Sequence, residues 1–126
     1  MTKTAITSTK LPPPVGPFSQ AIAANGSIYV SGQVGLDPQT GKVVAGGVVA
    51  ETEQVFRNLA AVLEAAGRTF ADVVRAGVYL TNMNNFADMN AVYAKHFPQP
   101  YPARTTIGVA ALPLGASVEI DLVVNG

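Results

Sequence analysis

Short hydrophobic stretches separated by turn-forming residues occupy the first third of the chain. Ala21–Ala24 and Ser27–Ser31 are apolar or β-branched runs that flank Asn25-Gly26, a dipeptide typical of tight hairpin turns. This pattern predicts a β-hairpin. Residues 12–17 contain four prolines and one glycine, which oppose helical geometry and strand hydrogen bonding. We therefore expect residues 1–17 to form an extended arm, with regular structure beginning after it.

Two later stretches show the three-to-four-residue hydrophobic spacing of helices. From about Val49 to Ala66 the apolar side chains fall on one stripe, and Gly67 is expected to end the helix as a C-terminal cap. In the second stretch, Asn84 or Asn85 is expected to cap a helix that Pro98 ends. Its apolar positions are Phe86, Met89, Tyr93 and Phe97.

Three further segments have the pattern of strands. Val73–Leu80 is apolar on both faces except at Arg75, and Arg104–Ala111 forms another run. In Ser117–Val124, valine, isoleucine and leucine alternate with acidic residues. The order of elements predicts an α+β domain with one mixed sheet and two helices on one face. The other face would leave apolar strand surface uncovered, so we expect it to pack against further copies of the chain.

Composition narrows the class of protein. The 126 residues suit one domain, and 48% hydrophobic against 13% charged residues suggests burial between subunits. Eight basic and eight acidic residues, without a basic cluster, argue against nucleic-acid or membrane partners. The absence of cysteine excludes disulfides and a catalytic thiol. With no apolar stretch resembling a signal or a membrane span, a soluble cytoplasmic protein is expected.

A few polar residues in apolar surroundings are candidates for chemistry. The planar guanidinium of Arg104 fits a carboxylate through two parallel hydrogen bonds, although the residue pattern alone favours a structural ion pair or an exposed edge charge. Glu119 lies opposite the apolar face of its strand, where it either orients water in a cleft or is simply solvated. Asn90 and Ser31-Gly32 offer ligand contacts, or are a helix-surface amide and a turn.

Other catalytic arrangements find little support. The single histidine, His96, is best explained by its place near a helix C-terminus, where it interacts with the helix dipole. No glycine-rich phosphate loop opens either predicted helix, paired metal ligands are absent, and a Ser-His-Asp triad would depend on His96 alone. The residue pattern therefore indicates a small oligomeric α+β domain with a candidate anion site.

Four segments in this order resemble the RidA (YjgF) family of reactive-intermediate deaminases, from about residue 11 to residue 124. They are Gly16–Ala21, Ile28–Gln33, Tyr101–Arg104 and Ala111–Ile120. The resemblance implies a chorismate-mutase-like α+β fold, assembled as a homotrimer around a central β-barrel, with active sites in clefts between neighbouring subunits. It also implies hydrolysis of short 2-imino acids, such as 2-iminobutanoate and 2-iminopropanoate, to 2-oxo acids and ammonia, with neither metal nor organic cofactor.

Carried over by position, the resemblance implies that Arg104 binds the substrate carboxylate and that Glu119 orients the hydrolytic water. The other matching pocket positions are Phe18, Ser31, Gly32, Asn90 and Thr106. Phe18 replaces a tyrosine that many members have, so a hydroxyl is missing. This difference motivates an alternative, a non-catalytic module that binds small 2-oxo or amino acids. A ribonuclease or translation inhibitor is a third hypothesis, which the neutral charge and the lack of a histidine pair oppose.

Overall fold

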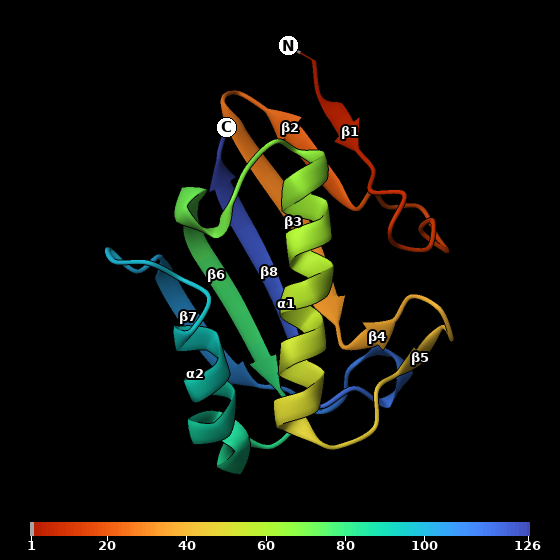
Figure 1. Cartoon of the computed structure of the whole chain (residues 1–126), viewed down its shortest axis with the longest axis vertical. Helices are drawn as coiled ribbons and strands as arrows, with labels where there is room; N and C mark the ends of the chain where they lie inside the picture. Colours follow the sequence, from red (N-terminus) through yellow and green to blue (C-terminus); the bar gives the residue numbers. More distant parts are fainter. Residues whose placement is uncertain (1) are drawn as a thin grey trace.

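One mixed sheet forms the centre of the protein in a computed structural model that describes residues 2–126 (Figure 1). Its strands are β1 (Thr4–Ile6), β2 (Ala21–Ala24), β3 (Ser27–Val34), β6 (Val73–Leu80), β7 (Ala103–Gly108) and β8 (Val118–Asn125). Their spatial order is β1-β2-β3-β8-β6-β7, and β6 and β7 are parallel while the other neighbours are antiparallel. A small separate hairpin joins β4 (Leu36–Asp37) to β5 (Lys42–Val43).

Two α-helices lie on the same side of this sheet, α1 (Val48–Ala65) and α2 (Phe86–Ala94) (Figure 1). The predicted α+β architecture with both helices on one face is thereby confirmed. Short 3-10 helices occur at Phe70–Asp72, Met83–Asn85 and Pro113–Gly115. Within residues 2–126 no helix is long and apolar enough to cross a membrane.

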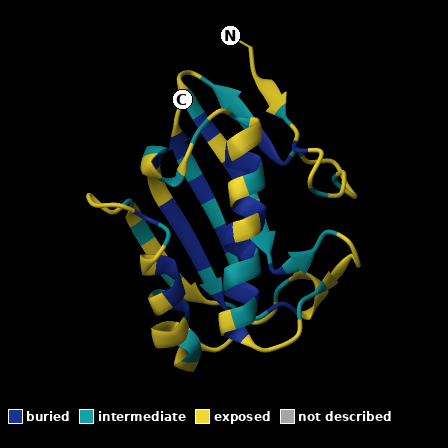
Figure 2. Ribbon diagram, in the orientation of Figure 1, coloured by how far each residue is buried: buried dark blue, intermediate teal, exposed yellow. Residues whose placement is uncertain are grey.

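Local sequence signals explain most of these elements. Asn25 and Gly26 both have positive φ, 54° and 73°, as the predicted hairpin turn between β2 and β3 requires. Gly67 follows α1 with a φ of 70°, which fits its expected role in ending the helix. The core lies between the helices and the sheet, and Figure 2 shows buried positions recurring along α1 and along the central strands.

An aromatic cluster ties the two helices together. Phe56 of α1 lies edge-on to Tyr93 of α2, with ring centroids 5.9 Å apart, and Phe97 lies 5.7 Å from Phe56. Phe70 completes the cluster at 5.5 Å from Phe56. Edge-to-face contacts of this kind favour one relative placement of the rings, so α2 is held firmly against α1.

The strand register shows which side chains share a face of the sheet. Ala76 pairs with both Arg104 and Leu122, and because Ala76 and Leu122 are buried under the helices, Arg104 points to the helix-covered face. Tyr79 pairs with both Ile107 and Glu119, which therefore share the opposite, open face. Arg104 and Glu119 of one chain are consequently separated by the sheet.

The open face of the sheet is uncovered in the single chain. Tyr29 and Ile107 are apolar side chains on this face and remain 50% and 45% exposed. Between them the Tyr79 hydroxyl donates to Asp121 Oδ2 at 2.7 Å. The face thus combines exposed apolar groups with paired polar groups, which is typical of a surface that another protein subunit covers.

Three details of the sequence prediction are wrong. Regular structure begins before the prolines, because Thr4–Ile6 forms the edge strand β1 beside β2. Three residues are too few to show an alternating pattern, and their backbone pairing with β2 is a tertiary contact. The expected side-chain cap at Asn84 or Asn85 is also wrong, since Asn82 caps the 3-10 turn before α2 by accepting from the Asn84 amide at 2.9 Å.

The second helix also ends earlier than predicted. The hydrophobic spacing extends to Phe97, but α2 stops at Ala94. Phe97 is nevertheless only 5% exposed, because its ring packs against Tyr93 with centroids 4.6 Å apart. A hydrophobic pattern shows which side chains are buried, and here buried side chains continue beyond the last helical residue.

Candidate active site

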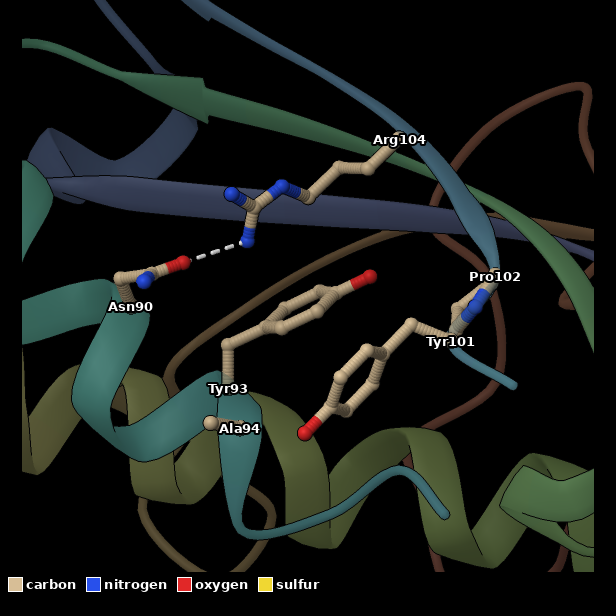
Figure 3. Close-up of a pocket in the computed structure, with 6 residues that line it drawn as sticks. All are labelled: Asn90, Tyr93, Ala94, Tyr101, Pro102 and Arg104. Carbon is tan, nitrogen blue, oxygen red and sulfur yellow. Dashed lines mark hydrogen bonds between the residues drawn. The ribbon is translucent and has the colours of Figure 1, made fainter. Parts of the chain in front are cut away.

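Arg104 lies in a cavity of about 470 Å³ between β7 and α2 (Figure 3). The cavity is lined by Asn90, Tyr93, Ala94, Tyr101, Pro102 and Arg104. Arg104 Nη1 donates to Asn90 Oδ1 at 2.7 Å, and Arg104 Cζ lies 4.6 Å from the centre of the Tyr93 ring. The cavity is thus built on one guanidinium that an amide and an aromatic ring hold in place.

Most of the hydrogen-bonding capacity of this guanidinium is unused. Among residues 2–126 its side chain makes one hydrogen bond, to Asn90, and no Asp or Glu lies within ion-pair distance. A guanidinium carries five N–H donors, which match a carboxylate in pairs. The structural ion pair considered for Arg104 is therefore absent from the described chain, and the arginine is free to receive an external anion.

Two hydroxyls beside Arg104 are sealed from solvent. Tyr93 Oη and Thr106 Oγ1 are both buried and have no hydrogen-bond partner among the described residues. Burial raises the pKa of Tyr93 above its usual value, against the opposing influence of Arg104, so the phenol stays neutral. Thr106 shares the helix-covered face of β7 with Arg104, but it does not present its hydroxyl to the cavity.

A second group of predicted site residues lies on the open face. The register between β3 and β8 shifts between Val30 and Gln33, which places a bulge at Ser31-Gly32. The carboxylate of Glu119 occupies the space above Gly32, because a Cβ atom there would lie 2.5 Å from Glu119 Oε2. Glycine at this position therefore leaves room for a carboxylate close to the backbone.

Glu119 is held in an environment that disfavours its charge. Partial burial raises the pKa of Glu119 above its usual value, and the carboxylate of Asp121, two residues along the same strand face, raises it further. Among residues 2–126 Glu119 has no side-chain hydrogen bond or ion pair. A carboxylate with a raised pKa is a stronger base, so it accepts a proton at neutral pH more readily than an ordinary glutamate.

We expect Glu119→Gln to stabilise the protein at about pH 7 and to lose this gain as the pH falls toward about 4. A raised folded-state pKa means that the folded protein binds a proton more tightly than the unfolded chain. Charged Glu119 therefore costs stability above its folded pKa, and the cost disappears below its unfolded pKa. Urea unfolding at fixed protein concentration measures the difference. Exposed Glu64 provides the control variant Glu64→Gln, and an equal gain at both pH values would contradict the prediction.

Ser31 and Phe18 extend the open-face group toward the N-terminal segment. The Ser31 hydroxyl donates to the Ser19 carbonyl at 2.6 Å, and the Ser31 amide donates to the Gln20 carbonyl at 3.0 Å. These bonds fix the loop that carries Phe18, whose ring is 55% exposed. The Ser31 hydroxyl is thus engaged within the chain, whereas Phe18 is open to a partner or a ligand.

The structure brings the predicted site residues together as two separate groups. The cavity group contains Arg104 and Asn90, with Thr106 beside it, whereas the open-face group contains Glu119 and Gly32 with Ser31 and Phe18 nearby.

The sequence prediction omitted two cavity residues. Tyr93 stood one helical turn after Asn90 and was assigned only to the hydrophobic stripe, and Tyr101 began the motif that contains Arg104.

His96 lies outside both groups. It follows the end of α2, as predicted, and its ring stacks on Phe56 with centroids 4.2 Å apart. Burial lowers the pKa of His96 below its usual value, although Glu53, 3.7 Å away, acts in the opposite direction. The histidine therefore belongs to the packing between the helices. Across residues 2–126 no three His, Asp or Glu side chains form a group suited to a metal ion.

Comparison with known proteins shows similarity along nearly the whole chain. A 2-iminobutanoate/2-iminopropanoate deaminase of Mus musculus is 48% identical over 118 residues, which are 94% of this chain and 87% of the mouse protein. The crystal structure of RidA from an Antarctic Psychrobacter is 42% identical, with a TM-score of 0.92 over 98% of this chain and 99% of that chain. Escherichia coli TdcF with bound serine is 30% identical, with a TM-score of 0.89 over 98% of both chains.

The family model described as Endoribonuclease L-PSP matches residues 8–125. This range includes every strand except β1, both helices, the cavity around Arg104 and the open-face group around Glu119. The fold and the sequence therefore agree on one assignment, and the chain belongs to the Endoribonuclease L-PSP family, the YjgF/RidA family.

Proposed function

We propose that this protein hydrolyses short 2-imino acids, such as 2-iminobutanoate and 2-iminopropanoate, to 2-oxo acids and ammonia. The observation that carries the proposal is the guanidinium of Arg104, which lies in a cavity with most of its donors free. Such a group suits the carboxylate that every 2-imino acid carries beside its C=N carbon. The mouse relative, 48% identical to this chain, bears the name of that activity.

The active site is proposed to form between two chains of a homotrimer. Arg104 and Glu119 lie on opposite faces of the sheet and do not meet within one protomer. The open face also exposes Tyr29 and Ile107, which another copy would bury. In this arrangement one protomer contributes Arg104 with Asn90, and its neighbour contributes Glu119 with Gly32.

The chemistry needs few groups because an iminium carbon beside a carboxylate is already electrophilic. Arg104 holds the carboxylate, and Glu119 accepts a proton from a water molecule whose oxygen forms a bond to C2. The π electrons of the C=N bond move onto nitrogen. Glu119 then returns the proton to that nitrogen. As the C–N bond breaks, the C2 hydroxyl gives its proton to Glu119 and its O–H electrons form the C=O bond, so ammonia and a 2-oxo acid are released.

The proposal is tested by adding purified protein to 2-iminobutanoate or 2-iminopropanoate generated in place by an amino-acid oxidase. We expect ammonia and 2-oxo acid to form faster than in the uncatalysed reaction, with a rate that saturates in substrate. An unchanged rate across several precursor amino acids would contradict the proposal.

A second candidate function is a receptor that binds a small 2-oxo or amino acid without converting it. The structure of TdcF contains bound serine, and Phe18 lacks the hydroxyl that a tyrosine would supply at this position. Calorimetric binding of 2-oxobutanoate or serine without imine turnover would favour this function.

RNA cleavage, which the family description names, suits this chain poorly. Eight basic and eight acidic residues leave no net positive charge to attract a phosphate backbone. The single histidine packs against Phe56. RNA cleavage that persisted in rigorously purified Arg104→Ala protein would support a ribonuclease.

A further inference from the structure

We propose that Tyr93 is a positioning residue for Arg104, and that the face of its ring holds the guanidinium in the orientation that receives the substrate carboxylate. The inference rests on the proposed function, in which Arg104 binds that carboxylate. In this role Tyr93 acts on the substrate through Arg104.

Two side chains of α2, Tyr93 and Asn90, contact the guanidinium from different directions, and the ring of Phe86 on the same helix lies farther away, 5.6 Å from Arg104 Cζ. Tyr93 presents its ring 4.6 Å from Arg104 Cζ, and Asn90 accepts a hydrogen bond from Nη1 at 2.7 Å (Figure 3). These residues are three positions apart on the helix, so their side chains project on the same side. The ring supports one face of the cation and the amide engages one edge, which leaves donors for a carboxylate.

The Tyr93 ring is itself immobilised. Its side chain is 5% exposed and packs against Phe56 at 5.9 Å and Phe97 at 4.6 Å between centroids. An arginine side chain has many rotamers, and fixing one before the ligand arrives removes part of the entropy cost of binding. The immobile Tyr93 ring thus restricts the long Arg104 side chain to one orientation before the ligand binds.

The ring, rather than the hydroxyl, carries this role. Tyr93 Oη is buried and has no hydrogen-bond partner of good geometry among residues 2–126, although Arg104 lies close enough to lower the Tyr93 pKa, so the hydroxyl is not presented to a ligand in the cavity. Attraction between a cation and an aromatic face needs only the ring, and phenylalanine supplies it. Removing an unpartnered hydroxyl also leaves no hydrogen bond broken.

The test compares Tyr93→Phe, which keeps the ring, with Tyr93→Leu, which removes it. Calorimetry gives the Kd for 2-oxobutanoate, and steady-state assays with 2-iminobutanoate give KM and kcat. We expect Tyr93→Leu to raise Kd and KM by about tenfold and to change kcat by less than about twofold. Tyr93→Phe is expected to stay within about twofold of the wild type in all three quantities. If circular dichroism shows the leucine variant unfolded, Tyr93→Met replaces it.

Phe70→Leu is the matched control. Phe70 belongs to the same aromatic cluster, 5.4 Å from Phe97, but lies outside the Arg104 cavity. This variant is expected to lower Tm and leave Kd unchanged, which separates a general loss of packing from a loss of arginine support.

Equal Kd values for Tyr93→Leu and the wild type would overturn the inference. Equal weakening in Tyr93→Phe and Tyr93→Leu would also overturn it, because the hydroxyl would then be the important group. These results leave the proposed function intact if the wild type hydrolyses imines. A wild-type protein that neither binds 2-oxobutanoate nor hydrolyses imines would overturn both proposals.

Discussion

Arg104→Ala is expected to lower kcat/KM for 2-iminobutanoate by about 100-fold, which corresponds to about 2.7 kcal/mol of transition-state stabilisation. The cavity around Arg104 offers the substrate carboxylate one cationic group, and Asn90 beside it carries no charge. Removing the guanidinium leaves the carboxylate partly desolvated and unpaired. Initial rates of 2-oxo acid formation across a range of substrate concentrations measure the effect.

Arg104→Lys and Arg57→Ala complete this experiment. Lysine keeps the charge but lacks the planar fork, so Arg104→Lys is expected to retain an intermediate activity. Arg57 is exposed on α1, donates to Gln54 and does not line the cavity, so its removal tests the loss of an arginine outside the site. If Arg104→Ala were as active as Arg57→Ala, the role assigned to Arg104 would be wrong.

Mixing two inactive variants, Arg104→Ala and Glu119→Gln, is expected to restore roughly one quarter of wild-type activity when protomers exchange freely at equal amounts. Within one chain the sheet separates the two residues, so each site needs Arg104 from one protomer and Glu119 from its neighbour. In a random mixture each protomer of a pair is the required variant half of the time. About one quarter of the sites therefore contain both an intact Arg104 and an intact Glu119.

The measurement is the imine hydrolysis rate after the two variants, carrying different affinity tags, are expressed together. Capture of one variant through the tag of the other establishes that mixed oligomers form. The control combines Arg104→Ala with protein carrying both substitutions, which cannot reconstitute a site between chains. Mixed oligomers that stay inactive would mean that the two residues do not serve one shared site.

Local sequence signals predicted the elements that depend on neighbouring residues. The Asn25-Gly26 turn, the stripe along α1 and the alternation along β8 each follow from residues within a few positions of one another. The three-residue strand β1 escaped prediction because its only support is pairing with β2. The end of α2 was misplaced because burial continues beyond the helix.

Most candidate site residues were found by chemical type, and Phe18 and Thr106 by the family resemblance, but their grouping required the fold. The sequence placed Glu119 opposite the apolar face of its strand, since the residues on either side alternate regularly. Arg104 lies in a strand where Thr105, Thr106 and Ile107 show no clear alternation, so no pattern indicated its face. Tyr93 read as a core residue because a buried ring under a cation has the same spacing as any other buried ring.

The amino-acid sequence by itself determined the α+β class, the two helices and the hairpin, and it gave Arg104 and Glu119 as candidates for chemistry. Only the tertiary structure decided that β7 lies two strands away from β8, and that Arg104 and Glu119 point to opposite faces of the sheet. The physical reason is that turns and amphipathic patterns are set by residues close together along the chain. The pairing order and register of distant strands depend instead on the packing of the whole core.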